Sequence, residues 1–514
     1  MKLLARPINL EVGGKYIVIL NREDAEYLGV RSLDRVRLRY LEKELTAIVN
    51  ETTKFTIKGE IITNDDVTNF FDLKGGEHIE VFPEEELESI IFIREKIAGA
   101  KLGYNKLKKI VKDVVDKKIS TIELTAFVTA LYTRGLSIDE AASLSKAMVE
   151  TGKRLRLPGK TVCDKHSIGG IPGDKTSLIL VPIIAVAGLT IPKTSSKAIT
   201  SPSGTAERMG VLAPVDLSLE EIEEVVNKTN ACLVWGGALD LAPADDVFIQ
   251  VEYPLGIDPM LLPSIMSKKK SVGAKYVVID IPMGRGTKVK TRAEARELAE
   301  DFIELGKRLG MHVACGITFG EQPLGHSIGP ALEAKEALQT LQGNGPRDLI
   351  IKATHLCDIL FNEAGMRNHG AALEILKTGK AENKLREIIE AQGGNAEIKA
   401  DDIVVGERTF DVKAEDDGRV LWIKNHDIVS VARKAGAPKD QGAGVYLNAK
   451  MGNSIKKGDV LFTIYSDSYN RLNEAIKLAK ELKPLVVGKQ FEEKMLLDKI
   501  FGEISKKKTL MLER

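Results

Sequence analysis

Apolar and polar residues alternate along the first 86 residues, as in the segments 15–20, 35–40 and 78–82. A period of two is typical of strands buried on one face, and the Gly, Asn and Asp residues between the segments favour turns. From about residue 85 the period becomes that of a helix. The pattern therefore predicts a small β-rich domain over residues 1–86, followed by helices.

Helix boundaries are marked by capping residues. Ser120 and Ser137 are each followed three residues later by a glutamate, and Gly152 follows the second apolar stretch. A serine with a glutamate at the third following position forms a capping box, and glycine commonly ends a helix. We expect two amphipathic helices that begin after these serines.

Short apolar strands alternate with long helical patterns in the middle of the chain. The expected strands lie at 231–235 and 276–281, and the expected helices lie at 218–229, 291–309 and 330–341. This alternation predicts an α/β sheet with crossover helices. Beyond about residue 402 strand patterns return, at 418–423 and 444–450, and the chain ends in a helical pattern. The fold class expected is multidomain α/β with β-rich domains at both ends.

The composition of the chain disfavours some classes of function but does not identify one. The 514 residues are 43% hydrophobic and carry a formal net charge of +1, so no global charge favours nucleic acid or an anionic membrane. The four cysteines form no Cys-x-x-Cys pair, and the longest apolar run, 178–189, is interrupted by Pro182. That run is too short to span a bilayer. We expect a cytoplasmic protein that binds no nucleic acid polymer and no membrane.

The glycine-rich segment 163–177 carries the strongest chemical signal. Lys165, His166 and Ser167 precede three glycines and a long apolar run. Glycine lets backbone N–H groups approach a ligand, and cationic and hydroxyl donors suit an anion such as phosphate. The segment matches neither Gly-x-x-x-x-Gly-Lys-Ser/Thr nor Gly-x-Gly-x-x-Gly. His-Ser-Ile-Gly recurs at 326–329, either as a second anion-binding loop or as a chance helix-entry sequence.

A second cluster of donors occupies residues 193–205. It contains Lys193 and Lys197 together with a run of Ser and Thr hydroxyls. The cluster directly follows an apolar strand pattern, where ligand-binding loops of α/β sheets lie. A polar surface loop is the alternative, because Ser, Gly and Pro are common in loops.

Several segments together resemble the thymidine/pyrimidine nucleoside phosphorylase family, and most of all its archaeal-type AMP phosphorylase branch. The resemblance covers about residues 90–485 with order and spacing kept, and the N-terminal domain is an addition that looks like a small β-barrel. It is carried by Leu124–Leu136, Lys165–Gly170, Gly173–Ser177, Lys193–Thr205, Leu241–Asp246 and Ser264–Lys269.

The resemblance implies a fold and an activity. It implies a helical domain in two pieces (87–158 and 237–271), an α/β domain with a mixed sheet (159–236 and 272–402) and a C-terminal β-rich domain with a helical tail (403–514). The reaction implied is phosphorolysis of nucleoside 5′-monophosphates, in which AMP and phosphate give adenine and ribose 1,5-bisphosphate. Inorganic phosphate would be a co-substrate, with no cofactor and no metal. A homodimer is implied, and the N-terminal domain could join dimers into larger homo-oligomers.

The resemblance also assigns site residues. Phosphate-binding positions match Lys165, Ser167, Ser177, Ser195 and Thr205. Nucleotide-binding positions match Gly169, Ser195, Ser196, Lys197, Ala198, Ile199, Thr200, Thr205 and Lys288. Base-reading positions match Ser264 and Lys268, and the proton donor matches Asp258. His166 would hold substrate or phosphate, or would simply pack at the helix entry.

Two residues leave the assignment open. Asp258 acts as an acid only if burial raises its pKa toward neutrality, and the alternative is a turn residue before Pro259. Asp245 stands where nucleoside phosphorylases carry an arginine that donates to a pyrimidine carbonyl, and a carboxylate accepts instead. This departure disfavours thymidine as substrate, although a pyrimidine nucleoside phosphorylase stays the main rival and a non-catalytic nucleotide-binding protein the weaker one. The substrate's 5′-phosphate needs its own cation, for which Lys288 and Lys197 come before Lys193 and Arg285.

Overall fold

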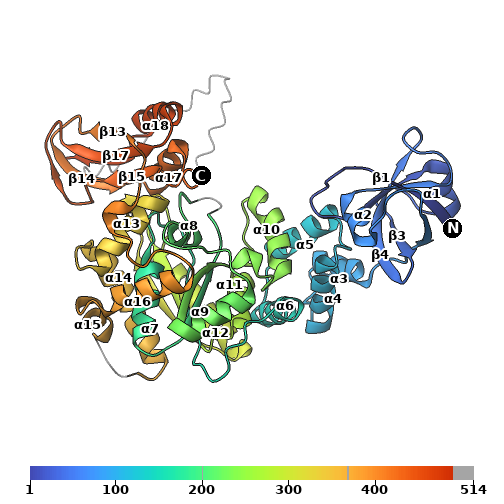
Figure 1. Ribbon diagram of the computed structural model, residues 1–514, viewed down its shortest axis with the longest axis horizontal. Helices are drawn as coiled ribbons and strands as arrows, with labels where there is room; N and C mark the ends of the chain where they lie inside the picture. The colour runs from blue at the N-terminus through green and yellow to red at the C-terminus, as the bar shows by residue number, and fades with distance from the viewer. Residues whose placement is uncertain (199–200, 367–369, 490–514) are drawn as a thin grey trace, which may run out of the picture.

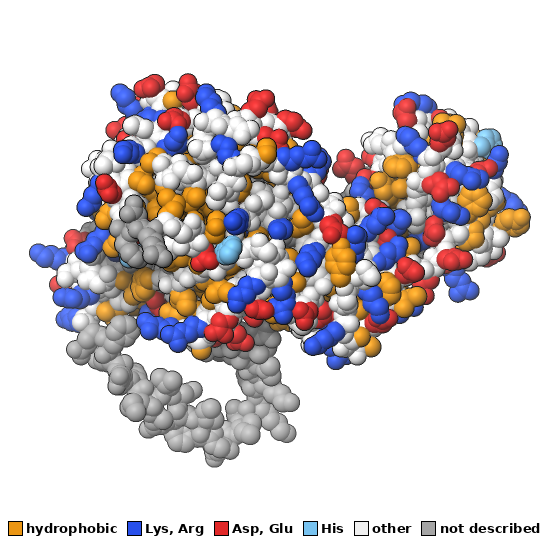
Figure 2. Space-filling model, turned by 90° about the horizontal axis from the view of Figure 1, so that it is seen from below, with side chains coloured by type: hydrophobic (Ala, Val, Ile, Leu, Met, Phe, Trp, Pro, Cys, Tyr) orange, Lys and Arg blue, Asp and Glu red, His pale blue; other side chains and the backbone are white. Residues whose placement is uncertain are grey.

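The computed structural model describes residues 1–198, 201–366 and 370–489. The chain folds into four parts in a row (Figure 1), with the N-terminal barrel at one end and the C-terminal β-rich part at the other. Charged side chains of both signs are interspersed on the face that Figure 2 shows. None of the helices in the described ranges is long and apolar enough to cross a membrane.

The N-terminal part is a closed six-stranded barrel with the strand order β1-β5-β2-β4-β3-β6. Its interior is filled by alternate residues of the strands, among them Leu20, Leu38 and Ile61, which are fully buried. The alternation of the sequence therefore does mark the inward face of each strand. The elements are β1 (Lys2–Pro7), β2 (Ile17–Asn21), α1 (Arg22–Leu28), β3 (Arg35–Tyr40), β4 (Lys43–Thr52), β5 (Glu60–Thr63), α2 (Asp65–Phe71) and β6 (His78–Pro83).

The helical part draws on two stretches of the chain. Its helices are α3 (Glu88–Ile97), α4 (Tyr104–Val115), α5 (Thr121–Arg134), α6 (Ile138–Thr151), α10 (Pro243–Leu255) and α11 (Leu261–Ser271). One apolar core joins the stretches, with Phe127 and Phe248 in ring contact at 6.1 Å. The capping boxes expected at Ser120 and Ser137 are both formed.

The α/β part is built around parallel strands, which bring their carboxyl ends to one edge. Strands β11, β10 and β7 form one sheet, and a bridge from Val162 to Thr190 leads to the parallel pair β8–β9. Among the described residues these ladders are all parallel, so the expectation of a mixed sheet is wrong. The alternation of strand and helix explains this, because crossover helices return the chain in the same direction.

The elements of this part, with the helices that cover it, are β7 (Cys163–Ser167), α7 (Thr176–Val186), β8 (Ile191–Ser195), α8 (Thr205–Gly210), α9 (Leu219–Thr229), β9 (Ala231–Trp235), a 3-10 turn (Gly236–Ala238), β10 (Tyr276–Met283), α12 (Arg292–Leu309), β11 (His312–Phe319), α13 (Pro330–Leu341), α14 (Arg347–Glu363), α15 (Ala371–Lys377), α16 (Lys380–Ala391) and a 3-10 turn (Ala400–Asp402). The helices expected at 218–229, 291–309 and 330–341 are confirmed to within a residue.

The C-terminal part has two antiparallel sheets, β12-β15-β17-β13 and β16-β14-β18, packed with two helices. Its elements are β12 (Ser327–Ile328), β13 (Arg408–Lys413), β14 (Gly418–Ile423), α17 (Asn425–Ala435), β15 (Gly444–Leu447), β16 (Ser454–Ile455), β17 (Val460–Ser466), α18 (Tyr469–Leu482) and β18 (Leu485–Gly488). The expected helical tail is α18 as far as the described residues reach, and a short strand follows it.

Candidate active site

The glycine-rich segment lies at the carboxyl end of β7. Lys165, His166 and Ser167 are the last three residues of this strand, and they pair in register with Val278–Asp280 of β10. Gly170 has a φ of +93°, and a Cβ there would lie 3.0 Å from the backbone N of Lys288. Only glycine suits this positive φ and this close approach. The loop is therefore held against residues 287–288, at the edge where parallel sheets bind ligands.

Lys165 is a buried amine with spare donors. Its side chain is 3% exposed, and Nζ lies 3.8 Å from Oδ2 of Asp174, which is beyond hydrogen-bond distance. Lys352 lies 3.7 Å from the same oxygen and 2.7 Å from Asp280. Burial alone would raise the pKa of Asp174, but Lys165 and Lys352 hold that pKa well below its ordinary value. Within the described part of the chain the Lys165 amine has no hydrogen-bond partner, so it can donate to an anion.

Asp164, next to Lys165, gathers lysines from two other elements. Lys269 of α11 donates to its Oδ2 at 2.6 Å, and Lys193 of β8 lies 3.8 Å from its Oδ1. Burial, together with the charge of Lys269, lowers the pKa of Lys193 to about 7. Burial and the surrounding lysines also lower the pKa of His166 well below its ordinary value. His166 is therefore a neutral imidazole at pH 7, which can donate or accept a hydrogen bond but adds no charge.

The second donor cluster continues from the end of β8. Glu207 accepts hydrogen bonds from the backbone N–H of Ala198 at 2.8 Å and of Gly204 at 3.0 Å, which folds the loop back on itself. The Ser195 hydroxyl lies at the end of β8 and donates to the Val234 carbonyl at 3.4 Å, and Ser196 follows in the loop. The expected contacts of Ile199 and Thr200 lie outside the described residues.

Lys197 already has two partners. Its Nζ lies 3.8 Å above the centre of the Trp235 ring and 3.6 Å from Oδ1 of Asp216. Arg285, another candidate for a phosphate, is likewise paired with Glu321 at 2.8 Å and lies over the Trp422 ring. A ligand phosphate would have to compete with these contacts.

Arg208 of α8 joins the two donor clusters, a role that the sequence patterns did not indicate. Its guanidinium donates to the carbonyl of Asp174 at 2.6 Å, to the carbonyl of Ser203 at 2.8 Å and to Glu333 at 2.5 Å. A guanidinium holds several acceptors in a fixed plane. The loop after β7 and the loop after β8 are therefore fixed relative to each other by one side chain.

The remaining expected phosphate ligands lie near helix starts or in the first loop. Ser177 is in the first turn of α7, and its hydroxyl has no hydrogen-bond partner among the described residues. Thr205 is the first residue of α8, 3.5 Å from Nη1 of Arg208. Ser167 accepts from the backbone N–H of Gly169 at 3.4 Å.

The expected base-reading residues share a buried carboxylate. Ser264 donates from Oγ to Oδ2 of Asp245 at 2.9 Å, and Nζ of Lys268 lies 2.6 Å from the same oxygen. Asp245 is fully buried on α10, whereas Ser264 and Lys268 lie one turn apart on α11. The residue that departs from the nucleoside phosphorylase pattern is thus in direct contact with both residues that the resemblance assigns to the base.

The expected proton donor is not buried. Asp258 accepts from Nζ of Lys288 at 2.8 Å, and the two side chains are 43% and 49% exposed. Burial of Asp258 was the condition set for an acid, and this structure does not meet it. Instead, burial and then the charge of Asp258 raise the pKa of Glu252 to about 7. Glu252 is 6% exposed on α10 and accepts from the backbone N–H of Met260 at 3.2 Å. No pattern in the sequence singled out Glu252.

The second His-Ser-Ile-Gly segment has a structural role. Nδ1 of His326 lies 2.7 Å from the Leu447 carbonyl, and β12 pairs with β15 of the C-terminal part. A Cβ on Gly329 would lie 2.3 Å from the Ala443 carbonyl. The segment therefore attaches the α/β part to the C-terminal part and is not a second anion loop.

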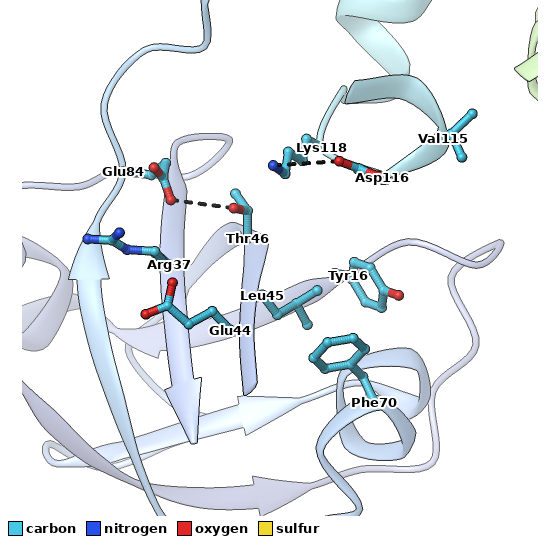
Figure 3. A pocket seen from close by; sticks show the side chains of 10 residues that line it. All are labelled: Tyr16, Arg37, Glu44, Leu45, Thr46, Phe70, Glu84, Val115, Asp116 and Lys118. Carbon is cyan, nitrogen blue, oxygen red and sulfur yellow. Dashed lines mark hydrogen bonds and ion pairs between the residues drawn. The ribbon is translucent and has the colours of Figure 1, made fainter. Parts of the chain in front are cut away.

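A cavity of about 570 Å³ lies away from these residues, between the barrel and the end of α4 (Figure 3). Tyr16 and Phe70 border it beside the charged side chains of Arg37 and Glu44. Aromatic, acidic and basic side chains line this cavity together, and they do not favour one chemical class of ligand. The candidate active site rests instead on the clusters around Lys165, Asp164 and Asp245.

Three family models match the chain in the order of its parts. The glycosyl transferase family, helical bundle domain matches residues 91–152, and the glycosyl transferase family, a/b domain matches residues 159–382. The pyrimidine nucleoside phosphorylase C-terminal domain matches residues 420–484. These matches define the class as a glycosyl transferase with a phosphorylase-type C-terminal domain.

Curated relatives cover the whole chain. AMP phosphorylase of Thermofilum pendens is 47% identical over 100% of both chains. AMP phosphorylase of Thermococcus kodakarensis is 48% identical over 95% of this chain and 97% of its own, and AMP phosphorylase 1 of Archaeoglobus fulgidus is 47% identical over 92% and 95%. The chain belongs to the AMP phosphorylase family. Among solved structures, anthranilate phosphoribosyltransferase from Thermus thermophilus is 19% identical with a TM-score of 0.49, and the match covers 59% of this chain and 99% of that one.

Proposed function

We propose that this enzyme is an AMP phosphorylase, a pentosyltransferase that converts AMP and inorganic phosphate to adenine and ribose 1,5-bisphosphate. The relatives that span the full length carry this activity in their names. The structural observation that carries the proposal is the buried Lys165 amine, which keeps free donors at the carboxyl edge of a parallel sheet.

The inorganic phosphate binds at the first loop. Lys165 supplies the charge, and the hydroxyls of Ser167 and Ser177 supply directional donors beside it, with Ser195 and Thr205 from the second cluster. A low-dielectric site strengthens each of these contacts and removes the water that surrounds phosphate in solution. His166, neutral at pH 7, adds a hydrogen bond to phosphate or sugar without changing the charge of the site.

The nucleotide lies across the second cluster and the base-reading helix. Gly169 and residues 195–198 contact the sugar and its phosphate, and Ser264 and Lys268 contact the base. Lys288 is the first candidate for the 5′-phosphate, because its only partner in the described residues is one half-exposed carboxylate. Lys197 is the second, because a phosphate would have to replace both Trp235 and Asp216.

Bond cleavage develops positive charge at C1 of the ribose and negative charge on the departing base. Asp258 protonates the base, which requires that Lys288 first leave this carboxylate. Closure of the helical part onto the α/β part would separate the pair and exclude water, as lids and domain closures do in other enzymes. The neighbouring Glu252, with its pKa raised to about 7, resists a second negative charge beside Asp258.

The reaction is tested by base release from AMP, UMP, adenosine and uridine, each with and without phosphate. We expect release from AMP that depends on phosphate, with ribose 1,5-bisphosphate as the second product. Stronger turnover of adenosine or uridine than of AMP would identify a pyrimidine or nucleoside phosphorylase instead. Release without phosphate would identify a hydrolase, and no release would leave a nucleotide-binding protein.

The assembly and location of the enzyme follow as further proposals. A homodimer, and larger homo-oligomers joined through the N-terminal barrel, stay predictions. Light scattering of the full chain and of a chain without residues 1–86 would test both. A cytoplasmic location and a reaction without cofactor or metal also stay predictions.

A further inference from the structure

Lys450 of the C-terminal part contacts segment 323–327 of the chain, which lies between β11 and α13. Its Nζ donates to the carbonyls of Pro323 and Gly325, the latter at 2.6 Å, and forms an ion pair with Asp348 at 3.1 Å. The side chain is only 13% exposed, and the three contacts use all three N–H donors of an ammonium. Removal of this amine would therefore take one partner from two carbonyls and a carboxylate at once.

The same segment is also bound by the glycine-rich loop. Lys175, which is fully buried, donates from Nζ to the carbonyls of Leu324 at 2.9 Å and of Ser327 at 3.1 Å. A Cβ on Gly173 would lie 2.7 Å from the Leu324 carbonyl oxygen, so the loop and the segment are in direct backbone contact. Because of this close contact, the segment cannot shift without displacing the loop.

The contacted part of the loop lies next to the expected phosphate ligands. Asp174, one residue before Lys175, lies 3.8 Å from Nζ of Lys165. Ser177, two residues after Lys175, is in the first turn of α7. A misplacement of about 1 Å in a reacting site can cost about 100-fold in rate, so the position of these residues decides how well they bind and aim phosphate.

We propose that Lys450 is a positioning residue for inorganic phosphate, which fixes segment 323–327 and, through Lys175, keeps the glycine-rich loop in the geometry that binds phosphate. Lys450 does not itself bind phosphate, because its three donors are already used. The coupling has a continuous physical path, since both lysines donate to carbonyls of one short segment. The inference rests on the proposed function, because it takes phosphate as the ligand of that loop.

The experiment measures the KM for inorganic phosphate at saturating AMP, and the KM for AMP at saturating phosphate, in the wild type, Lys450→Met and Lys424→Met. Lys424 is the matched control, because its Nζ donates to the Leu482 carbonyl at 3.1 Å and lies 3.6 Å from Asp427, both within the C-terminal part. We expect Lys450→Met to raise the KM for phosphate about 3- to 30-fold and the KM for AMP less than about 2-fold. Lys424→Met should change neither KM by more than about 2-fold.

A merely structural role of Lys450 would lower kcat or the melting temperature and leave both KM values unchanged, which would overturn the proposal. An equal rise in both KM values, or a rise in Lys424→Met as large as in Lys450→Met, would overturn it as well. Should Lys450→Met not fold, Lys450→Gln serves in its place, because its amide keeps two donors, and an unchanged KM for phosphate in that variant overturns the proposal too. A wild type that releases base from AMP without any dependence on phosphate instead refutes the proposed function, and this inference with it.

Discussion

Replacing Lys288 with methionine tests whether this residue binds the 5′-phosphate, because the change should weaken binding of AMP with little effect on the stability of the fold. Lys288 and Asp258 form an ion pair at 2.8 Å, but their side chains are 49% and 43% exposed. Pairs this exposed contribute about 0.2–1 kcal/mol, because solvent screens the charges and both side chains lose freedom. We therefore expect Lys288→Met to melt within a few degrees of the wild type.

The expected effect on catalysis is larger. In a closed site the ammonium would donate to a phosphate oxygen, and hydrogen bonds to charged groups contribute about 1.5–3 kcal/mol. That range corresponds to a roughly 10- to 150-fold loss in kcat/KM for AMP at 1.4 kcal/mol per factor of ten. Adenosine has no 5′-phosphate, so its inhibition constant as a competitor of AMP should change less than about 3-fold.

The assay measures steady-state phosphorolysis of AMP, inhibition by adenosine and thermal unfolding for Lys288→Met and Lys197→Met. Lys197 is the competing candidate for the 5′-phosphate, and we expect a smaller loss from Lys197→Met because Lys197 is already held by the Trp235 ring and Asp216. A loss for AMP in Lys197→Met, with none in Lys288→Met, would refute the assignment. Equal weakening of AMP and adenosine by Lys288→Met would show that the residue does not act through the phosphate.

Three further outcomes are expected. Lys165→Met should raise the KM for inorganic phosphate about 10- to 100-fold in initial-rate assays while the KM for AMP moves less, and an unchanged phosphate dependence would remove Lys165 from the site. Glu252 has a pKa raised from 4.5 to about 7, so the folded chain binds a proton there that the unfolded chain loses, and its contribution to stability falls as the pH rises from about 4.5 through 7. The melting temperature of Glu252→Gln, relative to that of the wild type at the same pH, should therefore be higher at pH 8 than at pH 5. A difference in melting temperature that does not depend on pH would contradict the raised pKa. Dialysis against EDTA should leave phosphorolysis of AMP unchanged, and restoration of lost activity by added Mg²⁺ or Zn²⁺ would contradict the expectation of a metal-free reaction.

Local patterns in the sequence were sufficient for the secondary structure. Ser120, Ser137 and Ser218 each cap a helix through the glutamate three residues later, so both partners of each box lie in one short segment. Strand direction depends instead on how distant segments return to the sheet. The expectation of a mixed sheet was taken from the family resemblance. The alternation of strands and helices along the chain itself favoured parallel pairing.

The side chains that form ion pairs with the charged residues of the site could not be predicted from local sequence patterns. Asp174 depends on Lys352 of α14, and Asp164 depends on Lys269 of α11, although each pair is far apart along the chain. No pattern in the sequence singled out Arg208, which becomes the link between two loops only when the fold brings their carbonyls within 2.8 Å of its guanidinium. The resemblance supplied the ligands, while the residues that set their charge and position come from tertiary contacts.

The pair of Asp258 and Lys288 links substrate choice to proton transfer. Asp258 accepts a hydrogen bond from Nζ of Lys288 at 2.8 Å, so this carboxyl group is not available to the base while the pair persists. A 5′-phosphate that draws Lys288 away leaves the Asp258 carboxyl group beside Glu252, whose own pKa is raised to about 7 by burial and then by the charge of Asp258. Adenosine lacks the group that does this, so the 5′-phosphate would serve turnover as well as binding. Lys288→Met removes the ammonium permanently, and the loss for AMP should therefore fall on KM more than on kcat.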